Sequence, residues 1–120
     1  MIKEIAFVAY AVSDIAASRK FYEGVLGLKT NDEFDGTKNP YFIEYAVGNS
    51  TLAIGQSPEW KPSEDGASVA LEVDNFDETI VMLKKQNVAF KVEPQDFFTC
   101  KMAVIQDPDK NKVCIHQKRA

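Results

Sequence analysis

The sequence predicts an α+β fold in which two βαβββ modules form a single domain of residues 1–120. Three observations support this fold class. The chain repeats itself, both halves show the same order of strand and helix patterns, and aliphatic side chains alternate along the strands. We expect module 1 at about residues 1–57, a linker at about 57–65 and module 2 at about 65–120.

The repeat appears when the chain is shifted by 61 residues. "AFVAYAVSDI" from Ala6 then aligns with "ASVALEVDNF" from Ala67, and "TLAIGQ" from Thr51 aligns with "KVCIHQ" from Lys112. A single offset aligns both ends of each half, and the apolar positions agree, which indicates two homologous modules. The connecting stretch "SPEWKPSED" is polar and contains two prolines, as is typical of a surface linker.

The first module begins with a strand at residues 2–12, where aliphatic side chains alternate. The stretch "SDIAASRKFYEGVLG" predicts a helix with Ser13 or Asp14 as its N-cap. Gly27 suits the left-handed position after the helix. Three further strands are predicted at about 28–34, 41–47 and 50–56.

The second module repeats this order. We predict a strand at 67–73 and a helix at about 75–86, with Asn87 in the role of Gly27. Strands are predicted at about 88–93, 99–106 and 112–117. The stretch "DPDKN" at 107–111 is a turn signature that joins the last two strands.

Alternation assigns the side chains to the two faces of each predicted sheet. One face is aliphatic, with Leu52 and Ile54 in the first module and Val69, Leu71 and Val73 in the second, and should pack under the helices. The opposite face mixes small, polar and aromatic residues, which suits the lining of a cavity better than a core. Its predicted members are Ile5, Phe7, Ala9, Thr51, Ala53, Gly55, Ser68, Ala70, Glu72, Lys112, Cys114 and His116.

Composition and charge disfavour several classes of protein. The formal net charge is −4, and basic residues are scattered except at Lys118 and Arg119, so a nucleic-acid surface is not expected. No apolar run approaches the roughly 20 residues needed to span a bilayer, and no signal peptide is expected. Cys100 and Cys114 are too few for a disulfide framework and flank the turn asymmetrically, which favours a reduced cytoplasmic setting.

The doubled βαβββ order, "VSDIAASRKFYEGVLGLK", "ALEVDN" and "QDPDKNKVCI" resemble the vicinal oxygen chelate superfamily along essentially the whole chain. That group includes glyoxalase I, extradiol dioxygenases, fosfomycin-resistance enzymes and bleomycin-resistance proteins. The resemblance implies that each module curves a mixed sheet around a cleft. It also implies a homodimer and, in the enzymes, a divalent metal held by the first and last strands of each module.

The four metal-binding positions of that family fall on Phe7, Ala53, Ser68 and Cys114. Phe, Ala and Ser do not serve as protein ligands for such a metal, and one Cys cannot replace three or four ligands. The chain also contains only one histidine, so a site with two histidines and one carboxylate is impossible. We therefore expect no metal and no other cofactor.

Other residues of the expected cleft have two interpretations each. His116 is either partly solvated at a strand end or a hydrogen-bonding or acid/base group for a ligand. Glu44 lies in "YFIEYAV" with Phe42 on one predicted face, and points either into the cavity or to solvent. Trp60 in the linker either covers the cleft or anchors the linker.

The leading functional hypothesis is metal-free binding of a small hydrophobic or aromatic molecule, similar to the sequestration that bleomycin-resistance proteins carry out, with no catalytic residue. Apolar contacts would come from Phe7, Phe42, Ala53 and Trp60, and other contacts from Glu44, Ser68, Cys114 and His116. The negative net charge favours a cationic ligand. The alternatives are an enzyme of the glyoxalase or dioxygenase type, and a non-catalytic interaction module whose cleft is plugged by Phe7.

Overall fold

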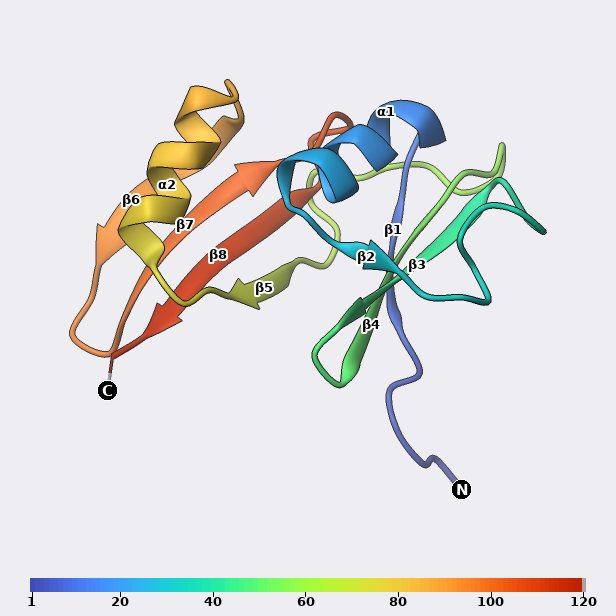
Figure 1. Ribbon diagram of the computed structural model, residues 1–120, viewed down its shortest axis with the longest axis horizontal. Coiled ribbons are helices and arrows are strands. Elements are labelled where there is room, and N and C mark those ends of the chain that lie inside the picture. Colours follow the sequence, from blue (N-terminus) through green and yellow to red (C-terminus); the bar gives the residue numbers. More distant parts are fainter. Residues whose placement is uncertain (120) are drawn as a thin grey trace. The chain divides into compact units, whose positions relative to one another are not determined.

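The chain folds into two compact units, Met1–Pro62 and Ser63–Ala120, in a computed structural model that describes residues 1–119 (Figure 1). Each unit contains one mixed sheet of four strands, which is curved and does not close into a barrel. The predicted α+β fold class and its two βαβββ modules are confirmed.

The first unit has the sheet order β1-β4-β3-β2. Strand β1 runs parallel to β4, and the other neighbours are antiparallel. The elements are β1 (Val8–Ala11), α1 (Ile15–Arg19), the π-helical segment η1 (Lys20–Val25), β2 (Lys29–Thr30), β3 (Phe42–Val47) and β4 (Ser50–Gly55).

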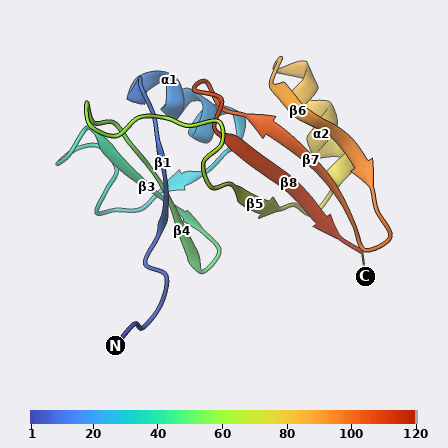
Figure 2. The same cartoon turned by 180° about the vertical axis from the view of Figure 1, so that it is seen from behind.

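The second unit has the equivalent sheet order β5-β8-β7-β6, with β5 parallel to β8. Its elements are β5 (Val69–Glu72), α2 (Phe76–Lys85), β6 (Ala89–Asp96), β7 (Cys100–Gln106) and β8 (Lys112–Lys118). Helix α2 covers one face of this sheet. Seen from behind, the opposite face of the sheet has no helix of this unit upon it (Figure 2).

The core of the first unit contains a column of three tyrosine rings between the helix and the sheet. Tyr22 of η1 is fully buried, and its ring centroid lies 6.1 Å from those of Tyr10 and Tyr45. The Tyr45 hydroxyl donates to Glu23 Oε2 at 2.9 Å, so the buried phenol retains a partner. The aliphatic face predicted for Leu52 and Ile54 is buried as expected.

The core of the second unit is aliphatic apart from Phe76. Phe76, Ile80 and Leu83 form the buried stripe of α2. They are joined in the core by buried residues from β7 and β8, namely Ala103, Ile105, Val113 and Ile115. The spacing of the stripe at i, i+4 and i+7 places it on one face of the helix, which is how α2 covers the sheet.

Two strands of the first unit are shorter than predicted. The strand predicted at 2–12 forms only as β1, whose four residues pair with Leu52–Gly55 of β4. The strand predicted at 28–34 ends at Thr30. There the Asn31 side chain accepts from Phe34 N at 2.8 Å, which bends the chain into a turn.

The predicted helix ends are confirmed. Asp14 caps α1 and Asn75 caps α2, each accepting hydrogen bonds from backbone N–H groups of the first turn. Gly27 and Asn87 both have left-handed backbones, with φ of 71° and 59°. Among residues 1–119, no helix is long and apolar enough to cross a bilayer.

Candidate functional site

The open face of the first sheet, which the helix does not cover, has Ala53 at its centre. In the strand register Ala53 lies between Ala9 of β1 and Glu44 of β3, and its side chain is fully buried. Small residues at Ala9 and Ala53 leave room above the sheet. Larger side chains from the neighbouring positions on the same face occupy this space.

Three phenylalanines fill this room. The Phe7 and Phe42 rings meet edge to face, with centroids 5.6 Å apart and planes at 71°. Phe42 pairs in register with Gly55, which is the next residue of β4 on this face after Ala53. Phe7 lies two residues before Ala9, which pairs with Ala53. The two rings therefore meet across the Ala53 row. The Phe34 ring also packs against Phe42 at 5.6 Å, which completes an aromatic cluster of Phe7, Phe34 and Phe42.

Glu44 lies on this open face and is half-buried. Its Oε1 accepts from Asn31 Nδ2 at 2.7 Å, and its backbone N–H donates to Phe34 O at 2.8 Å. The carboxylate is therefore held in place by a neutral amide rather than by a cation. Asn31 was not predicted as a site residue, since the sequence predicted that it lies within a regular strand.

Trp60 packs on β4 rather than extending away from the body of the unit. A Cβ atom added to Gly55 would lie 2.7 Å from Cζ3 of the indole and 3.2 Å from Cδ1 of Phe42. Gly55 thus permits the close approach of Trp60 to the sheet. The indole lies beside the aromatic cluster through its contact with the Gly55 row.

A cavity of about 500 Å³ opens beside Trp60. It is lined by Val12, Ser13, Tyr41, Gln56, Ser57, Pro58, Trp60, Lys61 and Pro62. Only Trp60 of these was predicted as a site residue. The others lie at the ends of β1 and β4, before β3 and in the linker, and the sequence has no motif that marks such strand ends as one cavity.

The remaining predicted residues lie in the second unit. Ser68 is exposed and precedes β5, whereas Cys114 pairs in register with Ala70 and Val104. Burial raises the pKa of the Cys114 thiol, which disfavours the nucleophilic thiolate. Cys100 pairs with Lys118 and so is not opposite Cys114, in agreement with the expectation of two free thiols.

His116 has a partner that the sequence analysis did not identify. Its Nδ1 lies 2.6 Å from Oε1 of Glu72, and Oε2 of Glu72 accepts from Lys118 N at 2.7 Å. The Lys118 N–H and then His116 lower the pKa of the Glu72 carboxyl. The parallel pairing of Glu72 with His116 in β5 and β8 places the pair on the open face of this sheet.

The donor atoms at the four family positions do not fit a divalent metal. Phe7 and Ala53 offer none, Ser68 offers a hydroxyl and Cys114 a thiol whose pKa is raised. Within residues 1–119, His, Cys, Asp and Glu side chains form no group of three or more that could hold a metal ion. We therefore derive no chemical step through a metal.

Comparison with known proteins gives consistent matches. The model of the Glyoxalase/Bleomycin resistance protein/Dioxygenase superfamily matches residues 4–115. The metallothiol transferase FosB of Staphylococcus saprophyticus is 31% identical in an alignment of 122 positions. The alignment covers 97% of this chain and 78% of that protein.

Two solved structures illustrate the shared fold. A glyoxalase/dioxygenase from Nostoc punctiforme matches with a TM-score of 0.82 and 19% identity, over 98% of this chain and 92% of that one. TnmS3, an antibiotic binding protein from a Streptomyces species, matches with a TM-score of 0.76 and 20% identity, over 98% of each chain.

Proposed function

Because this chain belongs to the Glyoxalase/Bleomycin resistance protein/Dioxygenase superfamily, we propose that it binds a small hydrophobic or aromatic molecule without a metal ion. The similar fold of TnmS3, an antibiotic binding protein, supports this proposal. The proposal concerns binding and assigns no catalytic residue.

One observation carries this proposal. Phe7, at a position where the family's enzymes have a metal ligand, packs on Phe42 across Ala53. The open face of the first sheet thus presents aromatic rings at this position, with the buried Ala53 beneath them and Glu44 beside Ala53. The rings favour contact with an apolar or aromatic guest, and Glu44 alone does not supply the three or four ligands of a divalent metal site.

The proposed contact residues are found in both units. In the first unit Phe7, Phe42 and Trp60 provide apolar contact, Ala53 lies buried beneath the Phe7 and Phe42 rings, and Glu44 provides a hydrogen-bond acceptor. In the second unit Ser68, Cys114 and His116 provide contacts, and Glu72 orients the His116 ring. We also propose that the chain forms a homodimer, which the exposure of Ile2 and Ile5 supports, and that it is cytoplasmic, which rests on its two free cysteines.

A second candidate function is an enzyme like the FosB relative, favoured by 31% identity across 97% of the chain. A third is an interaction module that binds no small molecule because the aromatic cluster of Phe7, Phe34 and Phe42 plugs the open face. Each predicts a different response to added ligands. An enzyme with an atypical metal site responds to added metals, and the plugged module responds to neither metals nor aromatic molecules.

A thermal-shift experiment on chelator-treated protein separates these functions. Ni, Zn, Mn, Fe(II) and Co are added first, followed by a panel of small aromatic molecules. A ligand of the folded state at 100 times its dissociation constant adds about 2.7 kcal/mol, a shift on the order of 10 °C. We expect no metal shift and a saturable shift with at least one aromatic molecule.

Matched variants assign that shift to the first unit. Phe42→Ala should weaken the aromatic ligand at least severalfold, whereas Phe98→Ala, whose side chain is 95% exposed in the second unit, should not. A specific metal shift would overturn the proposal in favour of the enzyme. If no aromatic molecule raised the melting temperature, the proposal would be overturned in favour of the plugged module.

A further inference from the structure

We propose that the cavity beside Trp60 binds a planar aromatic molecule carrying an anionic group, with Lys61 as the charge partner. This inference rests on the proposed function and places the ligand in a cavity that shares Trp60, but not Phe7 or Phe42, with the contacts proposed above. The cavity of about 500 Å³ has the size of a typical small-molecule site and lies wholly within the first unit.

The cavity walls are fixed by hydrogen bonds between segments distant in sequence. Gln56 N donates to Tyr41 O at 2.9 Å, and Gln56 Oε1 accepts from Ile15 N at 2.9 Å. Val12 N donates to Gly55 O at 2.9 Å, which joins the ends of β1 and β4. The walls therefore exist before a ligand arrives, which lowers the conformational cost of binding.

The linker forms the remaining wall. Trp60 N donates to Ser57 O at 3.1 Å, and these two residues form an isolated β-bridge. Pro58 and Pro62 on either side restrict the backbone further. The indole position is thus set by a short turn as well as by its contact with Gly55.

Two aromatic side chains at the cavity keep exposed surface. The residue Tyr41 is 57% exposed and Trp60 is 39% exposed, although both carry large rings. Rings that line a cavity with free surface offer stacking contacts, which favour a flat aromatic partner over a branched aliphatic one.

The charged residues that line the cavity determine the sign of the charge that a ligand should carry. Lys61 is the only Asp, Glu, Lys, Arg or His among the lining residues. Within residues 1–119 it takes part in no ion pair. The neighbouring carboxylate of Asp14 is engaged by the N–H groups of Ala16 and Ala17 at 3.1 and 3.2 Å.

An ammonium group without a carboxylate partner attracts an anion, and its flexible stem can adjust to the ligand. At this cavity Lys61 therefore favours an anionic ligand, whereas the net charge of −4 of the whole protein favours a cationic one. Fields from distant surface charges are screened within about 10 Å in 0.1 M salt, so the nearest group dominates at this site.

Calorimetric titration of the full chain with 2-naphthoate and its neutral analogue 2-naphthamide tests the inference. We expect 2-naphthoate to bind about fivefold more tightly, a preference that corresponds to one partly exposed charge pair. Lys61→Gln should remove this preference by weakening 2-naphthoate alone, and 0.5 M salt should reduce it. Lys29→Gln, an exposed lysine outside the cavity, should change neither affinity.

Tyr41→Leu should weaken both probes, because it removes a stacking ring without changing the charge. Equal affinities in the unmodified chain, or a preference that survives Lys61→Gln, would overturn the anion assignment while leaving the proposed function standing. Failure of both probes, with another aromatic molecule still stabilising the protein, would overturn the cavity assignment. Failure of every aromatic molecule would overturn the proposed function itself.

Discussion

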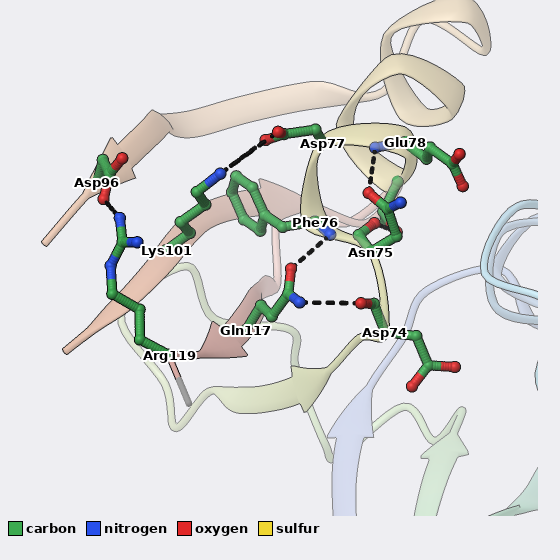
Figure 3. A network of polar contacts seen from close by, with 10 residues as sticks. Asp74, Asn75, Phe76, Asp77, Glu78, Asp96, Lys101, Gln117 and Arg119 are labelled. Carbon is green, nitrogen blue, oxygen red and sulfur yellow. Dashed lines mark hydrogen bonds and ion pairs between the residues drawn. The ribbon is translucent and has the colours of Figure 1, made fainter.

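Gln56 and Gln117, which are 61 residues apart, make the same hydrogen bond in the two units. Gln56 Oε1 accepts from Ile15 N at 2.9 Å and Gln117 Oε1 accepts from Phe76 N at 2.8 Å. Figure 3 shows Gln117 at the start of α2, where its Nε2 also donates to Asp74 O. Each glutamine thus links the end of β4 or β8, the last strand of its unit along the chain, to the first turn of the helix by a hydrogen bond.

Both glutamines should contribute to stability. We expect Gln56→Ala and Gln117→Ala each to lower the free energy of unfolding by about 1 kcal/mol, because each leaves a part-buried N–H without its acceptor. Chemical denaturation measures the loss. Gln95→Ala, at an exposed residue of β6, should stay within about 0.5 kcal/mol of the parent. A similar loss at all three positions would contradict a role in joining helix to sheet.

Ser18 should be a destabilising residue. Its side-chain oxygen is buried and has no hydrogen-bond partner within residues 1–119. We expect Ser18→Ala to raise the free energy of unfolding by about 1 kcal/mol, since it removes an unsatisfied hydroxyl and improves helix propensity.

Thr79 provides the matched control for Ser18, because it lies 61 residues later in α2. Its Oγ1 donates to Asn75 O at 2.7 Å, so Thr79→Ala loses a hydrogen bond that Ser18→Ala does not. The gain from Thr79→Ala should therefore be smaller. A larger gain at Thr79 than at Ser18 would show that the buried hydroxyl is not the cause.

Glu23 should make stability depend on acidic pH. Burial acts to raise its pKa, but hydrogen bonds from Arg19 and Tyr45 outweigh burial and lower the pKa of this carboxyl. A lowered folded-state pKa stabilises the protein above the ordinary glutamate pKa of about 4.3. The contribution is lost as the pH falls through the folded-state value.

Denaturation of Glu23→Gln between pH 7 and pH 3 tests this contribution. We expect the variant to be about 1 kcal/mol less stable at pH 7, with the difference shrinking as the pH falls below about 4. Glu59→Gln, in the exposed linker, should follow the parent at every pH. A difference between Glu23→Gln and the parent that does not change with pH would contradict the ionic origin.

Gly55 should control the position of Trp60. In Gly55→Ala the new methyl group would lie 2.7 Å from the indole, so the ring must move away from β4. Because Trp60 is the only tryptophan, we expect a red-shifted emission and stronger quenching by iodide. Gly24→Ala, where an added Cβ meets nothing within 4 Å, should leave the emission unchanged. An unshifted spectrum in Gly55→Ala would argue against the packing of Trp60 on β4.

The helix caps and the core faces could be predicted from local rules. Asp14 and Asn75 have side chains that accept backbone hydrogen bonds, and Gly27 tolerates a left-handed backbone, so residue type was sufficient. Alternation likewise placed Leu52 on the buried face and Ala53 on the open one. Phe7, Phe42 and Glu44 accordingly lie on the open face, although their contacts with one another and with Asn31 were not predicted.

The π-helical segment η1 could not be predicted. The N-caps Asp14 and Asn75 are 61 residues apart, whereas the left-handed residues Gly27 and Asn87 are 60 apart, because η1 adds one residue to the first helix. The offset of 60 persists between β3 and β7, where Phe42 pairs with Gly55 and Met102 with His116. The offset of 61 residues that aligns both ends of the two units therefore does not apply between the helix ends and β3 or β7, where the offset is 60.

The amino-acid sequence by itself determined the doubled βαβββ order and the helix caps, because each depends on residue type or spacing along the chain. Only the tertiary structure decided which side chains meet: Phe7 with Phe42 over Ala53, Glu72 with His116, and Trp60 with Gly55 beside the cavity. These contacts join residues between 5 and 44 positions apart. They depend on strand register and backbone turns, which no local pattern encodes.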